Sequence, residues 1–89
     1  MTYHLSGSIT VPSDALQQVR RALPEHIRAT LAEPGCRAFD VKERENGVFD
    51  VSEVFEDEAA FRAHQERMRG TAWETASATA LRSYKTWAA

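Results

Sequence analysis

Residues 57–73, DEAAFRAHQERMRGTAW, hold the pattern around which the rest of the chain is predicted to fold. The stretch begins with acidic residues and ends with basic ones, which is the order of charge that a helix dipole favours. Apolar residues and one histidine recur in it at steps of three and four: Ala60, Phe61, Ala63, His64 and Met68. They therefore share one helical face, which turns the imidazole towards the protein interior. Gly70 ends the predicted helix, and Trp73 follows after only two more residues.

The composition is that of one small, slightly acidic domain. The 89 residues include 13 acidic and 11 basic side chains, which give a net charge of −2, and no basic run is present. A nucleic-acid-binding surface is therefore not expected. No apolar segment approaches the ~20 residues of a membrane span, and a signal-peptide pattern is lacking, so we expect a cytoplasmic protein without membrane contact. The single cysteine, Cys36, excludes an internal disulfide and lacks the neighbouring ligands of a zinc site.

The first half of the chain predicts a strand followed by a helix. Residues 3–11 alternate between apolar and small polar side chains, and Gly7 inside this strand indicates a bulge or the close approach of another group. Ser13 is expected to cap the helix. Glu33-Pro34-Gly35 should end it, and Pro24 should kink it or split it into two segments.

The second half predicts a hairpin, a helix and a last strand. Asn46-Gly47 is a strong hairpin signal between residues 36–44 and residues 48–55, which both alternate as strands do. Glu53 interrupts an otherwise apolar face of the second of these strands. The helix described above follows, and residues 79–87 alternate again. The order of elements is therefore β-α-β-β-α-β.

With right-handed crossovers, this order gives a ferredoxin-like α+β fold in a single domain of residues 1–89. Its four-stranded antiparallel sheet should carry both helices on one face. The other face is left without helices and bears aliphatic and aromatic groups. We expect a partner sheet to cover it in a homodimer, because a chain of this length buries only a small core on its own.

Several motifs at consistent spacing resemble those of the antibiotic biosynthesis monooxygenase family. The first set is Glu33-Pro34-Gly35-Cys36, Phe39, Glu53, Phe55, and Ala60-Phe61 with His64. A second set is similar to the small quinol-monooxygenase-like members: Leu23-Pro24-Glu25-His26-Ile27, His64-Gln65-x-Arg67, Trp73, and Arg82-x-Tyr84. The resemblance covers nearly the whole chain, and it fits the predicted order and length of the elements.

This resemblance implies a homodimer whose two sheets form a barrel, with a cavity in each subunit between sheet and helices. It also implies oxidation of polycyclic phenols or quinols to quinones by O₂, with no metal, flavin or haem as cofactor. Some relatives degrade haem and carry an iron-ligating histidine after the second helix. Residues 70–78 of this chain contain no histidine.

The implied reaction needs a base near neutrality in a dry pocket, because the substrate must become an electron-rich anion before it reacts with O₂. His64 is the first candidate and His26 the second, while Glu53 is placed to orient an imidazole and stabilise its charge. The residues expected to bind a flat aromatic substrate and its oxygen are Phe55, Trp73, Arg82 and Tyr84.

Each of these residues also has a structural interpretation. A histidine on an apolar helix face is often a hydrogen-bonded core residue, and Glu53 could instead pair with Arg67. Two functions therefore remain open: a cofactor-independent monooxygenase with His64 as base, and a non-catalytic dimeric domain that binds a small ligand or is purely structural. An enclosed cavity beside His64, lined by Trp73 and Phe55, favours the enzyme or the ligand binder.

Overall fold

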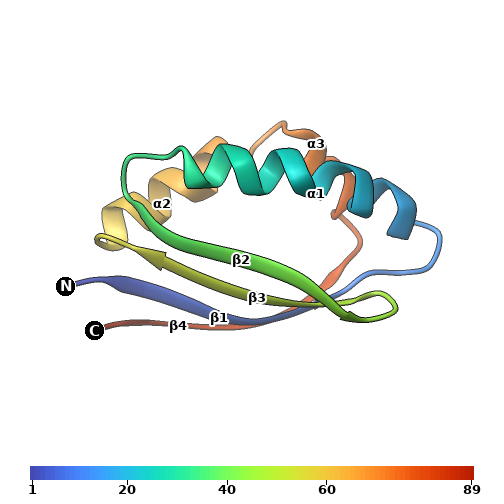
Figure 1. The fold of residues 1–89 in the computed structure, drawn as a ribbon, viewed down its shortest axis with the longest axis horizontal. Helices are drawn as coiled ribbons and strands as arrows, with labels where there is room; N and C mark the ends of the chain where they lie inside the picture. The colour runs from blue at the N-terminus through green and yellow to red at the C-terminus, as the bar shows by residue number, and fades with distance from the viewer.

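The computed structural model describes residues 1–89 and has the predicted order of elements with one short helix added (Figure 1). The elements are β1 (Tyr3–Thr10), α1 (Leu16–Leu31), β2 (Cys36–Glu45), β3 (Val48–Phe55), α2 (Glu58–Arg67), α3 (Ala72–Ala76) and β4 (Leu81–Ala88). The four strands form one antiparallel sheet in the order β2-β3-β1-β4. All helices lie on one face of the sheet, which confirms the ferredoxin-like fold (Figure 1).

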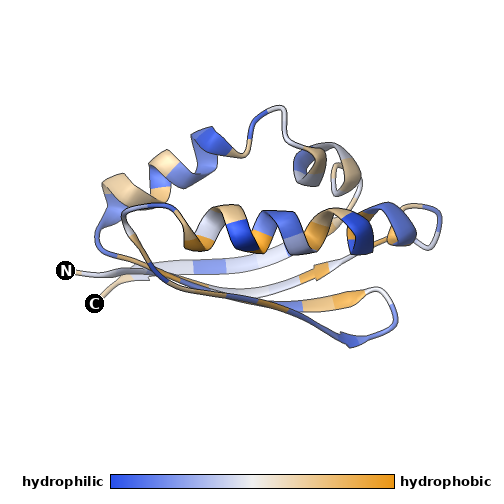
Figure 2. Ribbon diagram, turned by 45° about the horizontal axis from the view of Figure 1, so that its top comes forward, coloured by the Kyte–Doolittle hydropathy of each residue, from blue (hydrophilic) through white to orange (hydrophobic).

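The hydrophobic core lies between the helices and the inner face of the sheet. Alternation along β1 and β3 supplies most of it: Leu5 and Ile9, then Phe49, Val51 and Phe55, are all buried. Hydrophobic and hydrophilic residues also alternate along the ribbon of α1, as expected of a helix with only one buried face (Figure 2). None of the helices is long and apolar enough to cross a membrane.

Helix α1 differs from its prediction at its start, and it decides between the two effects predicted for Pro24. It runs unbroken for 16 residues with Pro24 inside it, so the split into two segments is wrong, and the kink stays a prediction. Ser13 does not cap it, because the N-cap position falls on Ala15 and makes no side-chain hydrogen bond. Packing of the buried Val19 and Thr30 on the rest of the fold outweighs the local cost of the proline.

Helix α2 follows its prediction closely, and α3 is the added element. Asp57 caps α2 by accepting a hydrogen bond from the Ala60 amide at 2.8 Å. Gly70 then adopts a φ of 76°, which a residue without Cβ adopts at little cost. Thr71 starts α3 by accepting a hydrogen bond from the Glu74 amide at 3.2 Å.

The face of the sheet opposite the helices carries an exposed aromatic pair near the chain ends. His4 and Trp87 stack there with ring centroids 5.2 Å apart, and Trp87 keeps 40% of its surface exposed. Lys85 places its ammonium 5.9 Å from the centre of the Trp87 ring. Leu81 on the same strand is also exposed. The expectation that a second subunit covers this face therefore stays a prediction.

Candidate functional site

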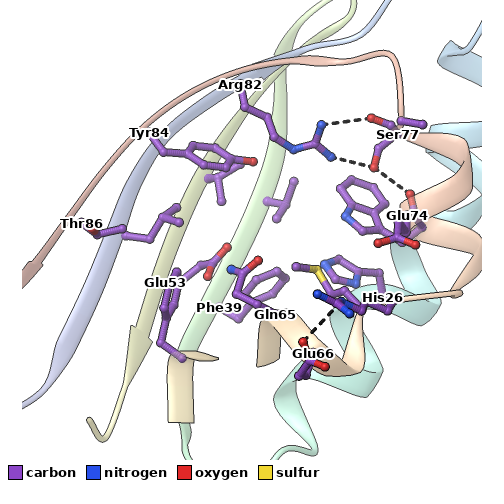
Figure 3. Close-up of a pocket in the computed structure, with 18 residues that line it drawn as sticks. His26, Phe39, Glu53, Gln65, Glu66, Glu74, Ser77, Arg82, Tyr84 and Thr86 are labelled. Carbon is purple, nitrogen blue, oxygen red and sulfur yellow. Dashed lines mark hydrogen bonds and ion pairs between the residues drawn. The ribbon is translucent and has the colours of Figure 1, made fainter. Parts of the chain in front are cut away.

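A cavity of about 680 Å³ opens between the helix layer and the sheet (Figure 3). Buried side chains of β1, β2 and β3 form its floor: Leu5, Phe39, Val41, Val51 and Glu53. Exposed side chains from α2, α3 and the edge strand β4 surround it. A space of this size, mostly apolar inside and polar around it, is typical of small-molecule sites.

Glu53 is the charged residue of the cavity floor. It lies on the inner strand β3 opposite Leu5, with only 6% of its surface exposed, and its carboxylate points into the cavity (Figure 3). Its Oε1 atom is buried and has no hydrogen-bond partner. Burial, and secondly the nearby charge of Glu33, raises the pKa of Glu53 to about 7.

The predicted pairing of Glu53 with Arg67 is wrong. The guanidinium of Arg67 instead forms an ion pair with Glu33 and donates to the Thr30 hydroxyl at 2.9 Å. The turn after α1 brings Glu33 to Arg67, and a contact between separate elements is not reported by the pattern of residues within either one. Glu53 is therefore left without a cation.

His26 and Trp73 form one wall of the cavity. Their rings, from α1 and α3, stack almost parallel with centroids 4.6 Å apart and an angle of 3°. The edge of Phe39 meets His26 at 5.3 Å. Burial, together with the nearby His64 and Arg67, lowers the pKa of His26 to about 3. His26 is therefore a neutral, flat platform at pH 7.

His64 is completely buried and does not line the cavity. Its Nδ1 lies 2.9 Å from Glu33 Oε2, and since a carboxylate only accepts, this nitrogen carries the proton. Its Nε2 has no partner, and its ring packs against Phe55 at 5.1 Å and Phe39 at 5.7 Å. Burial lowers the pKa of His64, although the hydrogen bond to Glu33 opposes this.

The expectation of a cavity beside His64 is therefore met only in part. His26, whose ring centroid is 5.9 Å from that of His64, lines the cavity, and so does Trp73. Phe55 does not line it and is fully buried against His64. Periodicity showed that the side chains of Phe55 and His64 point inward, but it does not show which inward side chains are covered by others and so do not reach the cavity.

Tyr84 and Arg82 bring the edge strand β4 to the cavity. The Tyr84 ring crosses β1 at Gly7, where an added Cβ would lie 2.9 Å from Tyr84 Cδ1 and 2.0 Å from the Ser83 carbonyl oxygen. The close approach predicted at Gly7 is therefore that of β4. Burial raises the pKa of the Tyr84 hydroxyl, so it remains protonated at neutral pH.

Arg82 is held away from the cavity floor by a residue that the sequence did not single out. Its guanidinium donates to the Ser77 hydroxyl at 2.8 Å and to the Ser77 carbonyl at 3.1 Å, as Figure 3 shows. The buried Ser77 in turn donates to the Trp73 carbonyl at 2.7 Å. A serine four residues after a tryptophan is the only signal in the sequence, and it is too common to identify a site.

The cavity combines an aromatic platform, a phenol, a guanidinium and one buried carboxylate that has no cation. Such a set can bind a flat ring and remove a proton from it. No group of three histidine, cysteine, aspartate or glutamate side chains in the chain is arranged to hold a metal ion. Cys36 is no thiolate, because burial raises its pKa.

Comparison with known proteins gives a family and a set of similar folds. A sequence model described as antibiotic biosynthesis monooxygenase matches residues 2–73. A candidate antibiotic biosynthesis monooxygenase from Nitrosomonas europaea is similar with a TM-score of 0.81 and 18% identity, over 100% of this chain and 98% of that one. A second such candidate, from Deinococcus radiodurans, has a TM-score of 0.75 and 20% identity, over 100% and 92% of the two chains.

A protein of unknown function from Bacteroides thetaiotaomicron, described as a possible oxidoreductase, has the same fold. Its TM-score is 0.73 at 18% identity, over 97% of this chain and 95% of that one. No protein of curated function matches the chain. At these identities the solved structures support the fold alone.

Proposed function

Because the chain belongs to the antibiotic biosynthesis monooxygenase family, we propose that it oxidises a polycyclic phenol or quinol to a quinone with O₂, without a resident cofactor. The observation that carries this proposal is the cavity, where a flat aromatic wall and a buried carboxylate without a cation lie in one mostly apolar space. A fused aromatic ring system fits such a space by stacking and desolvation.

The proposed reaction balances without an added reductant. A phenol with a ring C–H ortho or para to its hydroxyl loses that hydrogen and its O–H hydrogen, and one atom of O₂ becomes the new carbonyl oxygen of the quinone. A 1,4-quinol with a ring C–H also loses two hydrogens overall, and the O₂ atom becomes the hydroxyl oxygen of a hydroxyquinone. In both cases the other atom of O₂ leaves as water. The substrate itself supplies all four electrons, so its deprotonated, electron-rich form is the species that reacts with O₂.

The residues around the cavity have separate roles in this proposal. His26 and Trp73 form the stacking platform, and the Tyr84 hydroxyl and Arg82 guanidinium are donors to a substrate oxygen. His64 has no access to the cavity, so in this proposal it is a positioning residue that holds Glu33 and packs behind the platform. The proton is taken by a group that does line the cavity.

The first test is oxygen uptake by the protein in the presence of a metal chelator, with anthrone, 1-naphthol and 1,4-naphthohydroquinone as substrates. We expect uptake above the uncatalysed rate, with one ¹⁸O atom from ¹⁸O₂ in the quinone and the other in water. Trp73→Leu should raise KM by up to about tenfold, the value of one aromatic contact. Trp87→Phe, on the opposite face of the sheet, is the matched control and should leave KM unchanged.

Binding of these compounds without oxygen uptake would overturn the enzyme proposal. It would support the alternative of a non-catalytic ligand-binding domain, which the same cavity can serve. If the protein neither binds nor oxidises any of them, both functions fail for this class of compound.

A further inference from the structure

We propose that Glu53 is the catalytic base of the cavity, and that its carboxylate accepts the O–H proton of a phenolic substrate. The inference rests on the proposed function for the identity of the substrate. Sequence reasoning gave Glu53 only the role of orienting a histidine, whereas here Glu53 itself accepts the proton.

The environment of Glu53 is the first argument. A buried carboxylate that serves only the fold is expected to be paired or fully hydrogen-bonded, because burying an unpaired charge is costly. Glu53 lies in the middle of the sheet, is 6% exposed, and leaves Oε1 without a partner inside the chain. Its carboxylate points into the cavity, where a ligand is the missing hydrogen-bond donor (Figure 3).

The charged groups near the cavity have other partners and do not pair with Glu53. From α2, Arg69 pairs with Glu66 at 3.3 Å, and from β4, Arg82 is bound to Ser77. From α3, Glu74 accepts from the Gly70 amide at 2.9 Å. None of these groups neutralises the Glu53 carboxylate.

The remaining titratable groups around the cavity also favour Glu53 as base. His26 on α1 and Tyr84 on β4 are both uncharged at neutral pH. Glu33, behind the wall, is a like charge and adds to the rise in the pKa of Glu53 to about 7. The carboxylate is thus half ionised near neutrality, which is the best balance for a general base.

The chemical step is a single proton transfer. The ionised carboxylate accepts the phenolic proton and becomes a neutral carboxylic acid, and the substrate becomes a phenolate. The negative charge moves from the carboxylate to the ring, so the charge of the cavity does not change. His26 is a poorer acceptor, because a pKa of about 3 makes its imidazole a much weaker base.

The deciding variant is Glu53→Gln, which keeps the shape of the side chain and cannot accept the proton as a carboxylate does. For the wild type, kcat/KM with 1-naphthol should rise with pH through about 7 and then level off. Glu53→Gln should lower kcat by about 10²–10⁴-fold, change KM much less, and lose this pH dependence. Glu56→Gln, in an exposed ion pair with Arg37, is the matched control and should leave the profile unchanged.

A second readout does not depend on turnover. Under anaerobic conditions, 1-naphthol should bind the wild type more tightly as pH rises through about 7, because the ionised carboxylate accepts the phenolic hydrogen bond more strongly than the neutral acid does. Tryptophan fluorescence, with Trp73 in the cavity wall, follows this binding. In Glu53→Gln the Kd should not change over this pH range.

The outcomes separate the two proposals. If the wild type turns over and Glu53→Gln keeps both its rate and its pH profile, Glu53 is not the base, while the proposed function stands. If no substrate is oxidised, the proposed function fails, and anaerobic binding still decides whether Glu53 meets the phenol. A Kd independent of pH in the wild type would overturn that contact.

Discussion

The buried carboxylate of Glu53 should make the protein less stable as pH rises. Its pKa is raised from 4.5 to about 7 in the folded protein, so the folded state holds this proton over a range where the unfolded chain has lost it. The free energy of unfolding should therefore fall between pH 4.5 and about 7 and stay reduced above it. One pKa unit is worth about 1.4 kcal/mol, which gives a total loss of about 3 kcal/mol.

The histidines change stability in the opposite direction and must be separated from this effect. The pKa of His26 is lowered to about 3 and that of His64 is also lowered, so the free energy of unfolding rises with pH up to the unfolded value of about 6.5, and for His26 this rise begins near pH 3. Both histidines are present in the wild type and in Glu53→Gln. The difference in free energy of unfolding between these two proteins therefore isolates Glu53.

The assay is urea unfolding followed by circular dichroism, at one protein concentration, from pH 4.5 to 8.5. As pH rises across this range, the free energy of unfolding of Glu53→Gln should increase by about 3 kcal/mol relative to that of the wild type. A cost of the amide that does not depend on pH shifts the whole curve and leaves this increase unchanged. Parallel curves for the two proteins would refute the reasoning. They would mean that Glu53 has an ordinary pKa and that the cavity hydrates its carboxylate.

Four further predictions concern other parts of the structure. Gly7→Ala should destabilise the fold by about 1–3 kcal/mol in urea unfolding, since an added Cβ would lie 2.0 Å from the Ser83 carbonyl oxygen; unchanged stability would contradict this contact. His64→Ala should cost about 2–5 kcal/mol and raise the susceptibility to proteolysis, because it empties a fully buried site and leaves Glu33 without one partner. A variant as stable as the wild type would show that His64 has no structural role. Light scattering should give a molar mass of about twice the 10.0 kDa chain mass, and Trp87→Lys on the helix-free face should reduce this mass to that of one chain. A wild-type monomer at micromolar concentration would show that no partner sheet covers this face. Ser77→Ala should free the Arg82 guanidinium and raise KM for 1-naphthol by up to about tenfold, since charged hydrogen bonds are worth about 1.5–3 kcal/mol and only part of that reaches the substrate.

The order and type of the main elements could be predicted from the sequence, because side-chain period reports local geometry directly. Alternation in residues 3–11 and 48–55 marks strands, and Asn46-Gly47 joins two of them in a hairpin. The short helix α3 was not predicted as a helix, since five residues carry too little period. The helix cap was misjudged, and Pro24 does not split the helix, because packing outweighs local preference in α1.

The candidate site depends on relations that no local pattern carries. The sequence alone determined which residues point inward, including His26, Glu53 and His64, since each lies on a buried face of its element. Only the tertiary structure decided which of them reaches the cavity and which ion pairs form. Glu33, in the turn after α1, pairs with both His64 and Arg67, so His64 stays buried in the core and Glu53 keeps an oxygen without a partner. The physical reason is that pairing and burial are set by distances between elements, whereas sequence period fixes only the direction of each side chain within its own element.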